Sequence, residues 1–188
     1  MGMNGCQIEV IRSARKTLAL QVTRDMRVVV RAPFWVSGKE IDRFVSEKSA
    51  WISEKLAQMS LCAEKTKDAP KFTKGEIADM TKKAREVITE RLSFFAARMG
   101  VKYGKVTVRH QTSRYGSCSS KGNLSFNCVL VLCPDWVLDY VVVHELCHLK
   151  QMNHSAAFWA EVGALMPNYR EAREWLKQNG GVLIQRLK

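Results

Sequence analysis

The chain has 188 residues, 46% of them hydrophobic, which is enough for one well-packed core or a core with a small appended lobe and excludes a disordered chain. Its formal net charge of +12 is compatible with a nucleic-acid partner without requiring one. No apolar run near the histidine motif is long enough to span a membrane, and no signal sequence is visible. The six cysteines form no CxxC pair and no regular framework. Together these features predict a soluble cytosolic protein with no membrane partner.

The first part of the chain has the pattern of a small sheet followed by a helix. Three short segments between residues 7 and 31 are rich in β-branched residues and partly alternate, which predicts a small antiparallel sheet. Ser37 and Glu40 form a capping box ahead of residues 41 to 59, where apolar side chains recur at mostly three and four positions. We therefore expect an amphipathic helix packed on the sheet, and a first domain over residues 1–62.

A charged connection over residues 62 to 72 leads into a second expected domain, residues 73–188. Thr73 and Glu76 make a second capping box at its start. The apolar stripe that follows holds helical spacing until Gly100, which is placed for a left-handed C-terminal cap. The sequence therefore predicts one long helix here.

The outer face of this long helix is basic. Residues 61 to 110 contain twelve Lys or Arg against six acids. The face lacks the interleaved aromatic residues that stack on single-stranded bases, and no DNA-binding motif accompanies it. We therefore expect a solvated face, with nucleic acid as a possible but not favoured partner; its basic residues are Lys82, Lys83, Arg85 and Arg91.

Two alternating runs, residues 106 to 110 and 124 to 130, enclose the Gly- and Ser-rich segment RYGSCSSKGN. This arrangement predicts a hairpin or adjacent strands. A strand beside a metal-binding helix can present an edge on which an extended substrate lies. The alternative is that residues 114 to 119 form an ordinary turn with no role in substrate binding.

The most informative stretch follows these strands. On a helix, His144 and His148 project from one face one turn apart, so both imidazoles can reach a single ion. Glu145 lies beside that face, where it can act on a bound water without being a ligand. His154 can return to the same ion if the helix ends near Asn153. Three protein ligands leave a fourth tetrahedral position open, which is typical of a catalytic zinc site.

The motif has two other interpretations, a helix with structural histidines and a different third ligand. A buried helix with merely hydrogen-bonded histidines would have to bury Glu145 without a charged partner, which is costly, whereas a divalent cation supplies one. Glu161 is the rival third ligand, although the spacing from His148 favours His154. Gln151 stands where metzincins place a glycine, so the chain is not a metzincin.

Helix signals frame the motif on both sides. Pro134 and Asp135 predict the start of the metal-binding helix, and Ser155 can cap a further helix. A last helix is expected over residues 169 to 177, ended by the glycine pair at 180 and 181.

The stretch YVVVHELCHLKQMNHSAAFW, preceded by RYGSCSSKGNLSFN and followed by MPNYREAREWLKQNG, resembles the YgjP-like metallopeptidase family, related to the SprT and WLM metalloproteases. The resemblance is dense from about residue 105 to 180 and loose before it. It implies an α+β protein whose small N-terminal antiparallel sheet and helix precede a zincin-like core of helices and a short antiparallel sheet. It also implies one zinc ion held by His144, His148 and His154, with Glu145 as the catalytic base.

These residues predict a zinc-dependent metallopeptidase that hydrolyses peptide or protein substrates through a metal-activated water. Arg114, Tyr115 and Tyr169 are unranked candidates for stabilising the oxyanion. The alternatives are a nucleic-acid-associated SprT-like protease or DNA-binding protein, and a zinc-stabilised binding module without catalysis. Glu145 argues against the last, because a structural site needs no base. Cleavage preference and oligomeric state are not encoded in any pattern we identify.

Overall fold

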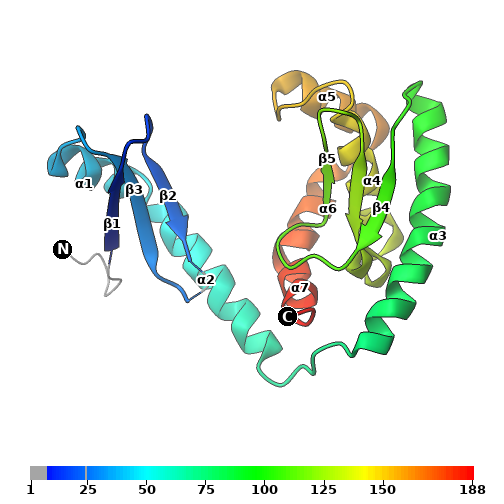
Figure 1. Cartoon of the computed structure of the whole chain (residues 1–188), viewed down its shortest axis with the longest axis horizontal. Helices are drawn as coiled ribbons and strands as arrows, with labels where there is room; N and C mark the ends of the chain where they lie inside the picture. Colours follow the sequence, from blue (N-terminus) through cyan, green and yellow to red (C-terminus); the bar gives the residue numbers. More distant parts are fainter. Residues whose placement is uncertain (1–7, 24) are drawn as a thin grey trace. The chain divides into compact units, whose positions relative to one another are not determined.

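The computed structural model describes residues 8–23 and 25–188, and the chain divides into two compact units, Met1–Glu64 and Lys65–Lys188 (Figure 1). Each unit has its own hydrophobic core and is described by itself. Each combines a small three-stranded sheet with helices, which confirms the expected α+β class. Compactness does not test independent folding, so the domain limits 1–62 and 73–188 stay a prediction.

The first sheet consists of β1 (Ile8–Ser13), β2 (Ala19–Val22) and β3 (Val28–Pro33), in the order β1-β3-β2. β2 pairs with β3 antiparallel, but β1 pairs with β3 in parallel, so the expectation of a purely antiparallel sheet is wrong for that pair. Burial explains the order. β3 contains the fully buried Val28 and Val30, and the central position pairs it on both edges, while the more exposed β1 and β2 form the edges.

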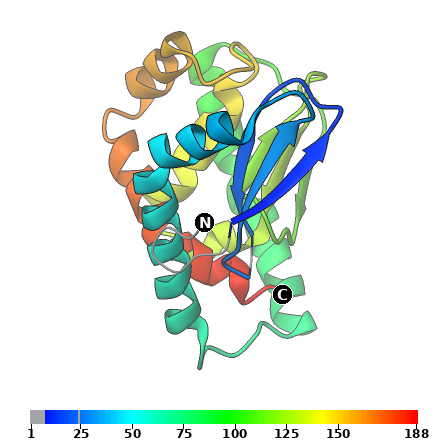
Figure 2. The ribbon, with the colours of Figure 1, turned by 90° about the vertical axis from the view of Figure 1, so that its left-hand side faces the viewer.

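Two helices accompany this sheet, α1 (Gly38–Glu47) and α2 (Ser49–Thr66) (Figure 2). The predicted capping box at the start of α1 is confirmed. The amide N of Glu40 donates to Ser37 Oγ at 3.3 Å, and the amide N of Ser37 donates to Glu40 Oε2 at 2.9 Å. These two hydrogen bonds satisfy backbone donors that the first helical turn leaves free.

The single helix expected over residues 41 to 59 is broken at Lys48, whose φ of −100° and ψ of 7° are not helical. The amide N of Lys48 donates to the carbonyl oxygen of Val45 at 3.1 Å, three residues back instead of the four of an α-helix. Ile41 and Ile52, on either side of the break, still reach the same core. Because α2 continues to Thr66, the charged connection begins later than residue 62.

The second unit opens with α3 (Lys74–Met99), whose predicted ends are both confirmed. Thr73 and Glu76 form the capping box, and Gly100 closes the helix with a left-handed φ of 64°. A non-glycine residue would be strained in that conformation. The middle of the predicted stripe is buried, whereas its two ends, Ile77 and Met99, are only partly buried. The buried members are Met80, Ala84, Ile88, Leu92 and Phe95.

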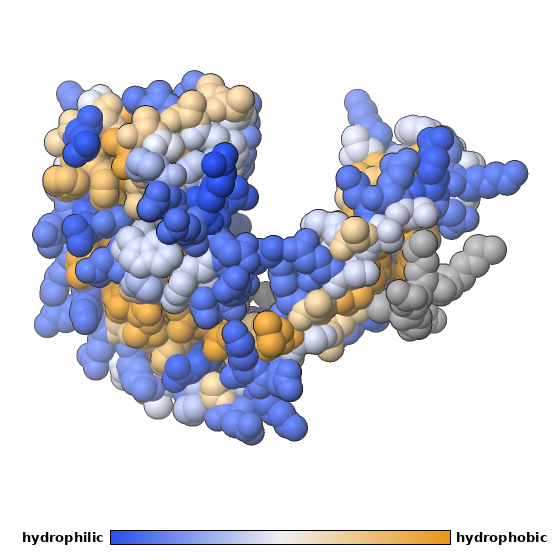
Figure 3. Space-filling model, turned by 180° about the vertical axis from the view of Figure 1, so that it is seen from behind, coloured by the Kyte–Doolittle hydropathy of each residue, from blue (hydrophilic) through white to orange (hydrophobic). Residues whose placement is uncertain are grey.

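The basic face of α3 is mostly solvated. Lys82, Lys83 and Arg85 are exposed as expected, and the face of the molecule in Figure 3 mixes broad hydrophilic areas with smaller hydrophobic patches. Arg91 differs, because its Nε lies 3.2 Å from Oδ1 of Asp139 in α4 (Asp135–Cys147). Arg91 therefore ties α3 to α4 instead of belonging to the free face.

The second sheet consists of β4 (Val106–Arg109), β5 (Gly116–Cys118) and β6 (Leu124–Asn127), in the order β4-β6-β5. β5 and β6 form the antiparallel hairpin, but β4 and β6 are parallel, so the expected short antiparallel sheet is again mixed. The cause is the same as in the first sheet. All four residues of β6 are buried, and the strand takes the centre. β5 is left as an edge strand, and it contacts α4.

A 3₁₀ segment (Cys128–Leu132) leads into α4, which is followed by α5 (Ala156–Leu165) and α6 (Tyr169–Trp175). The expected stop at the glycine pair is wrong, since a π-helical turn (Leu176–Gly180) carries the chain into α7 (Gly181–Gln185). The cysteines among the described residues form no disulfide, and Cys6 lies outside these residues. No helix among residues 8–23 and 25–188 is long and apolar enough to cross a bilayer.

Candidate metal centre

Helix α4 supplies the first two histidines. The helix ends at Cys147, earlier than the expected end near Asn153, and His148 is its C-terminal cap residue. The cap keeps helical dihedral angles, with φ of −65° and ψ of −17°, so the four-residue spacing still places both imidazoles on one face. The ring centroids of His144 and His148 are 4.9 Å apart.

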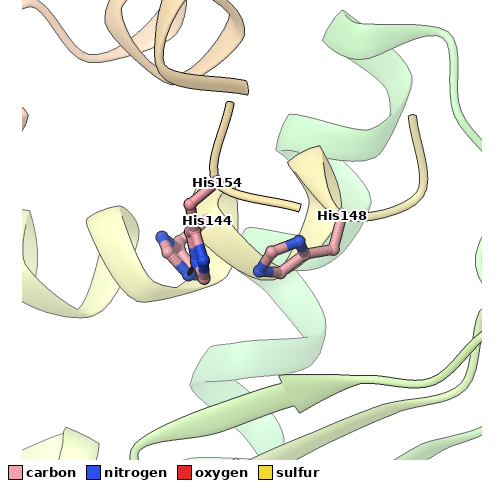
Figure 4. Close-up of side chains that lie close together, drawn as sticks. All are labelled: His144, His148 and His154. Carbon is pink, nitrogen blue, oxygen red and sulfur yellow. Dashed lines mark hydrogen bonds between the residues drawn. The ribbon is translucent and has the colours of Figure 1, made fainter. Parts of the chain in front are cut away.

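The loop between α4 and α5 brings His154 to the same place. Ser155 caps α5 as predicted, accepting from the amide N of Phe158 at 3.4 Å, and Asn153 Oδ1 accepts from the amide N of Ser155 at 3.3 Å. The chain turns at these caps, and the Nε2 atoms of His154 and His144 lie 3.1 Å apart. The three imidazoles point toward one another (Figure 4).

Hydrogen bonds at the outer nitrogens orient the rings. His148 Nδ1 lies 3.0 Å from the carbonyl oxygen of Gln151, which can only accept, so Nδ1 carries the proton and the lone pair is on Nε2. Nδ1 of His144 lies 3.3 Å from the hydroxyl of Tyr140. Metal-binding histidines have partners of this kind, because the second hydrogen bond selects the tautomer.

The donor set fits a small divalent ion. One ligand atom from each of the three histidines lies within 4.8 Å of the others. Tetrahedral zinc, with Zn–N bonds of about 2.0–2.1 Å, needs ligand nitrogens about 3.3 Å apart. Small side-chain rotations therefore suffice to bring all three nitrogens to one ion. Glu161, the rival ligand, instead forms an ion pair with Lys150 Nζ at 3.1 Å.

Aromatic side chains of α5 support the imidazoles. Phe158 is fully buried, and its ring centroid lies 4.6–4.9 Å from those of the three histidines. Trp159 stacks on His154 at 5.7 Å and on Tyr169 at 5.3 Å. Tyr169 is 9% exposed, so it packs in the core.

Burial lowers the pKa of two of the three histidines, His144 and His154. It lowers the pKa of His144 to about 3, helped by the neighbouring His148, His154 and Arg173. Burial also lowers the pKa of His154, with smaller contributions from His148 and Arg173. Both imidazoles are therefore neutral at neutral pH, which is the protonation state that binds a metal ion.

Glu145 is buried between α4 and β5, with 5% of its surface exposed. Burial raises its pKa to about 7, and the charge of Arg114 opposes that rise. Its carboxylate packs directly on Gly116, where an added Cβ would lie 2.6 Å from Glu145 Oε1 and 2.8 Å from Cγ. Only glycine at this position of β5 leaves room for the carboxylate.

Gly116→Ala is expected to displace Glu145 and to lower the free energy of unfolding by about 1–3 kcal/mol, the usual cost of overpacking. Denaturant unfolding measures the change. Gly163→Ala is the matched control, because its Cβ would meet Tyr169 at an ordinary 3.6 Å and alanine favours the helix. Equal stabilities for the two variants would contradict the role of Gly116.

Asn127 is a structural residue of the site whose role no sequence pattern reveals. It is fully buried, and its Nδ2 donates to the carbonyl oxygens of Gln111 at 2.6 Å and Arg114 at 2.9 Å. Its amide N donates to the carbonyl oxygen of Tyr115 at 2.8 Å. These partners are at least a dozen residues away, so spacing could not identify them. Asn127 thus holds the loop that carries Arg114 toward Glu145.

Tyr115, one of the candidates for stabilising the oxyanion, lies against Gly180, and its role stays a prediction. A Cβ on Gly180 would collide with the Tyr115 hydroxyl, so the ring packs directly on the π-helical turn. Gly180 is therefore a site of close approach and not a helix terminator.

Comparisons with known proteins found a family match and two similar solved structures. The family described as YgjP-like, metallopeptidase domain, matches residues 16–78 and 61–179. Among solved structures, the metallopeptidase zymogen abylysin of Pyrococcus abyssi is 24% identical, with 48% of this chain and 93% of that chain covered and a TM-score of 0.44. The zymogen jannalysin of Methanocaldococcus jannaschii is 19% identical, with 48% and 94% covered and a TM-score of 0.44. A search of curated proteins found no significant match.

Proposed function

This chain belongs to the YgjP-like metallopeptidase family, and on that premise we propose that it is a zinc-dependent peptidase that hydrolyses peptide bonds in peptide or protein substrates. The observation that carries the proposal is the convergence of three imidazole nitrogens within 4.8 Å of one another, two from α4 and its C-terminal cap and one from the loop that follows, beside the buried Glu145. A site that only stabilised the fold would not need that carboxylate.

In this proposal His144, His148 and His154 hold one zinc ion per chain. Three ligands leave one coordination position for water or substrate. A bound zinc ion would polarise the scissile carbonyl and lower the pKa of a water molecule toward neutrality. Tyr140 and Gln151 keep the outer imidazole nitrogens of His144 and His148 engaged, so the inner nitrogens stay aimed at the ion.

Glu145 is the general base. Its carboxylate accepts a proton from the attacking water and then delivers it to the amine nitrogen of the leaving product as the C–N bond breaks. Burial and the contact with Gly116 restrict the movement of its side chain. Asn127 supports the same chemistry indirectly, since it fixes the loop whose Arg114 acts electrostatically on Glu145.

The substrate is proposed to lie extended along β5. This strand pairs with β6 on one edge only, and its hydrogen-bonding register there is antiparallel. The other edge has backbone groups that an added peptide strand can pair with. Because β5 contacts α4, a peptide on that edge would pass close to Glu145.

Metal analysis combined with an unbiased peptide-library digest tests the function. We expect about one zinc per chain, cleavage of a subset of library peptides, loss of cleavage on dialysis against a chelator, and recovery when zinc is returned. A protein that takes up zinc but cuts no peptide would be a zinc-stabilised binding module. A protein that takes up no zinc would lack the proposed centre.

A further inference from the structure

Arg173 lies beside the metal centre without an acidic partner. It is exposed on α6, and its Cζ lies 4.4 Å from the ring centroid of Trp159. Trp159 stacks on His154 with 24° between the ring planes. Among the described residues no carboxylate forms an ion pair with Arg173. Its charge is therefore available to a ligand that enters the centre.

The aromatic ring beneath it orients the guanidinium. Trp159 is half-buried, with Tyr169 stacked at 5.3 Å and Phe158 edge-on at 5.1 Å, so the ring is held on several sides. An arginine over an aromatic ring keeps the N–H donors at its rim free for a planar acceptor. Arg173 is thus preorganised for a carboxylate, whose two oxygens match the guanidinium fork.

Nearby acids do not neutralise this charge. Glu174, the neighbour of Arg173 on α6, is paired with Lys177 at 3.8 Å, and Glu161 of α5 is paired with Lys150 at 3.1 Å. Trp159, over which Arg173 lies, has its ring centroid 5.9 Å from that of His144 and 5.7 Å from that of His154, so Arg173 lies beside the metal centre. A negatively charged group on the substrate would therefore be attracted to this side of the centre.

We propose that Arg173 forms a subsite for a substrate carboxylate next to the scissile bond, so that acidic peptides are preferred substrates. The proposal rests on the metallopeptidase function and adds a substrate class to it. The carboxylate has two possible sources, an acidic side chain or a free peptide C-terminus, and both present the same chemistry to Arg173.

Peptide hydroxamates are suitable probes, because the hydroxamate group binds the metal ion without being cleaved. One matched pair differs only in Glu or Gln beside the hydroxamate, with the C-terminus amidated. A second pair has Ala there and differs only in a free or amidated C-terminus. Titration calorimetry on the zinc-loaded protein measures each dissociation constant. We expect that, in one of the two pairs, the peptide with the carboxylate has a dissociation constant roughly five- to tenfold lower than its amide counterpart.

Arg173→Gln is expected to abolish that preference, with zinc content and melting temperature close to those of the parent. Arg170→Gln is the matched control, since Arg170 lies on the same helix with its Cζ 5.3 Å from the ring centroid of Tyr169, and it is expected to retain the preference. If Arg173 only packed on Trp159, or only contacted the reacting carbonyl, its substitution would change the dissociation constants of both members of a pair by the same factor.

Three results would overturn the inference. If all the hydroxamates bind the parent equally, or if Arg173→Gln keeps the preference, the subsite is wrong while the metal centre stands. If no hydroxamate binds and no zinc is taken up, the proposed function fails and the subsite fails with it.

Discussion

The His154→Ala protein is expected to lose its zinc while keeping its fold. His154 is exposed on a loop, so its removal leaves the core intact. Two imidazoles remain, and the loss of a direct ligand should exceed the roughly 10–100-fold drop in affinity that follows loss of an outer-shell partner. Elemental analysis after dialysis, together with titration of zinc into the metal-free protein, measures the change.

Glu161→Ala is the control for this experiment. Glu161 pairs with Lys150 and is the rival third ligand by sequence, so the two variants separate the two ligand sets. We expect Glu161→Ala to bind zinc as the parent does, apart from the small effect of losing a half-exposed ion pair. The opposite pattern, with zinc lost only in Glu161→Ala, would replace His154 with Glu161 in the centre.

Local signals in the sequence predicted local structure well. The capping boxes at Ser37 and Thr73 and the left-handed Gly100 each depend on a few adjacent residues, and all three are present in the structure. The buried stripe of α3 follows from helical periodicity alone. Such features are decided within one or two turns, so no tertiary information is needed.

Features that depend on contacts between segments distant in the sequence could not be predicted in the same way. Alternation along β1 and β4 shows that each is a strand, but the parallel pairing of each depends on which other strand is buried most deeply. The break at Lys48 and the π-helical turn before Gly181 depend on packing across the fold. Glycine at position 180 indicated a helix end, whereas the structure requires glycine there because the Tyr115 ring packs against it.

The same distinction applies to the candidate site. The spacing of His144, His148 and His154 indicated a common ion, and the structure brings these three side chains together, while their roles as ligands stay a prediction. Tyr140 could have been anticipated, since it precedes His144 by one helical turn. Asn127 and Gly116 could not, because their partners come from distant segments.

Glu145→Gln is expected to keep the zinc and to lose peptidase activity. The amide preserves the shape of the side chain in its buried position against Gly116, and the three imidazoles are untouched. It cannot accept a proton from water, and acid–base assistance of this kind typically contributes about 10²–10⁴-fold in rate. The measurement compares kcat/KM for one peptide taken from the library digest, with zinc content determined on the same sample.

Glu161→Gln provides the matched control, because it makes the same change in a carboxylate close to the centre that is already paired with Lys150. Its activity should stay near that of the parent, which would show that loss of a nearby negative charge is not enough to stop the reaction. Parental activity in Glu145→Gln would remove this residue from the base role. Loss of zinc together with activity would instead indicate that Glu145 acts by maintaining the metal centre.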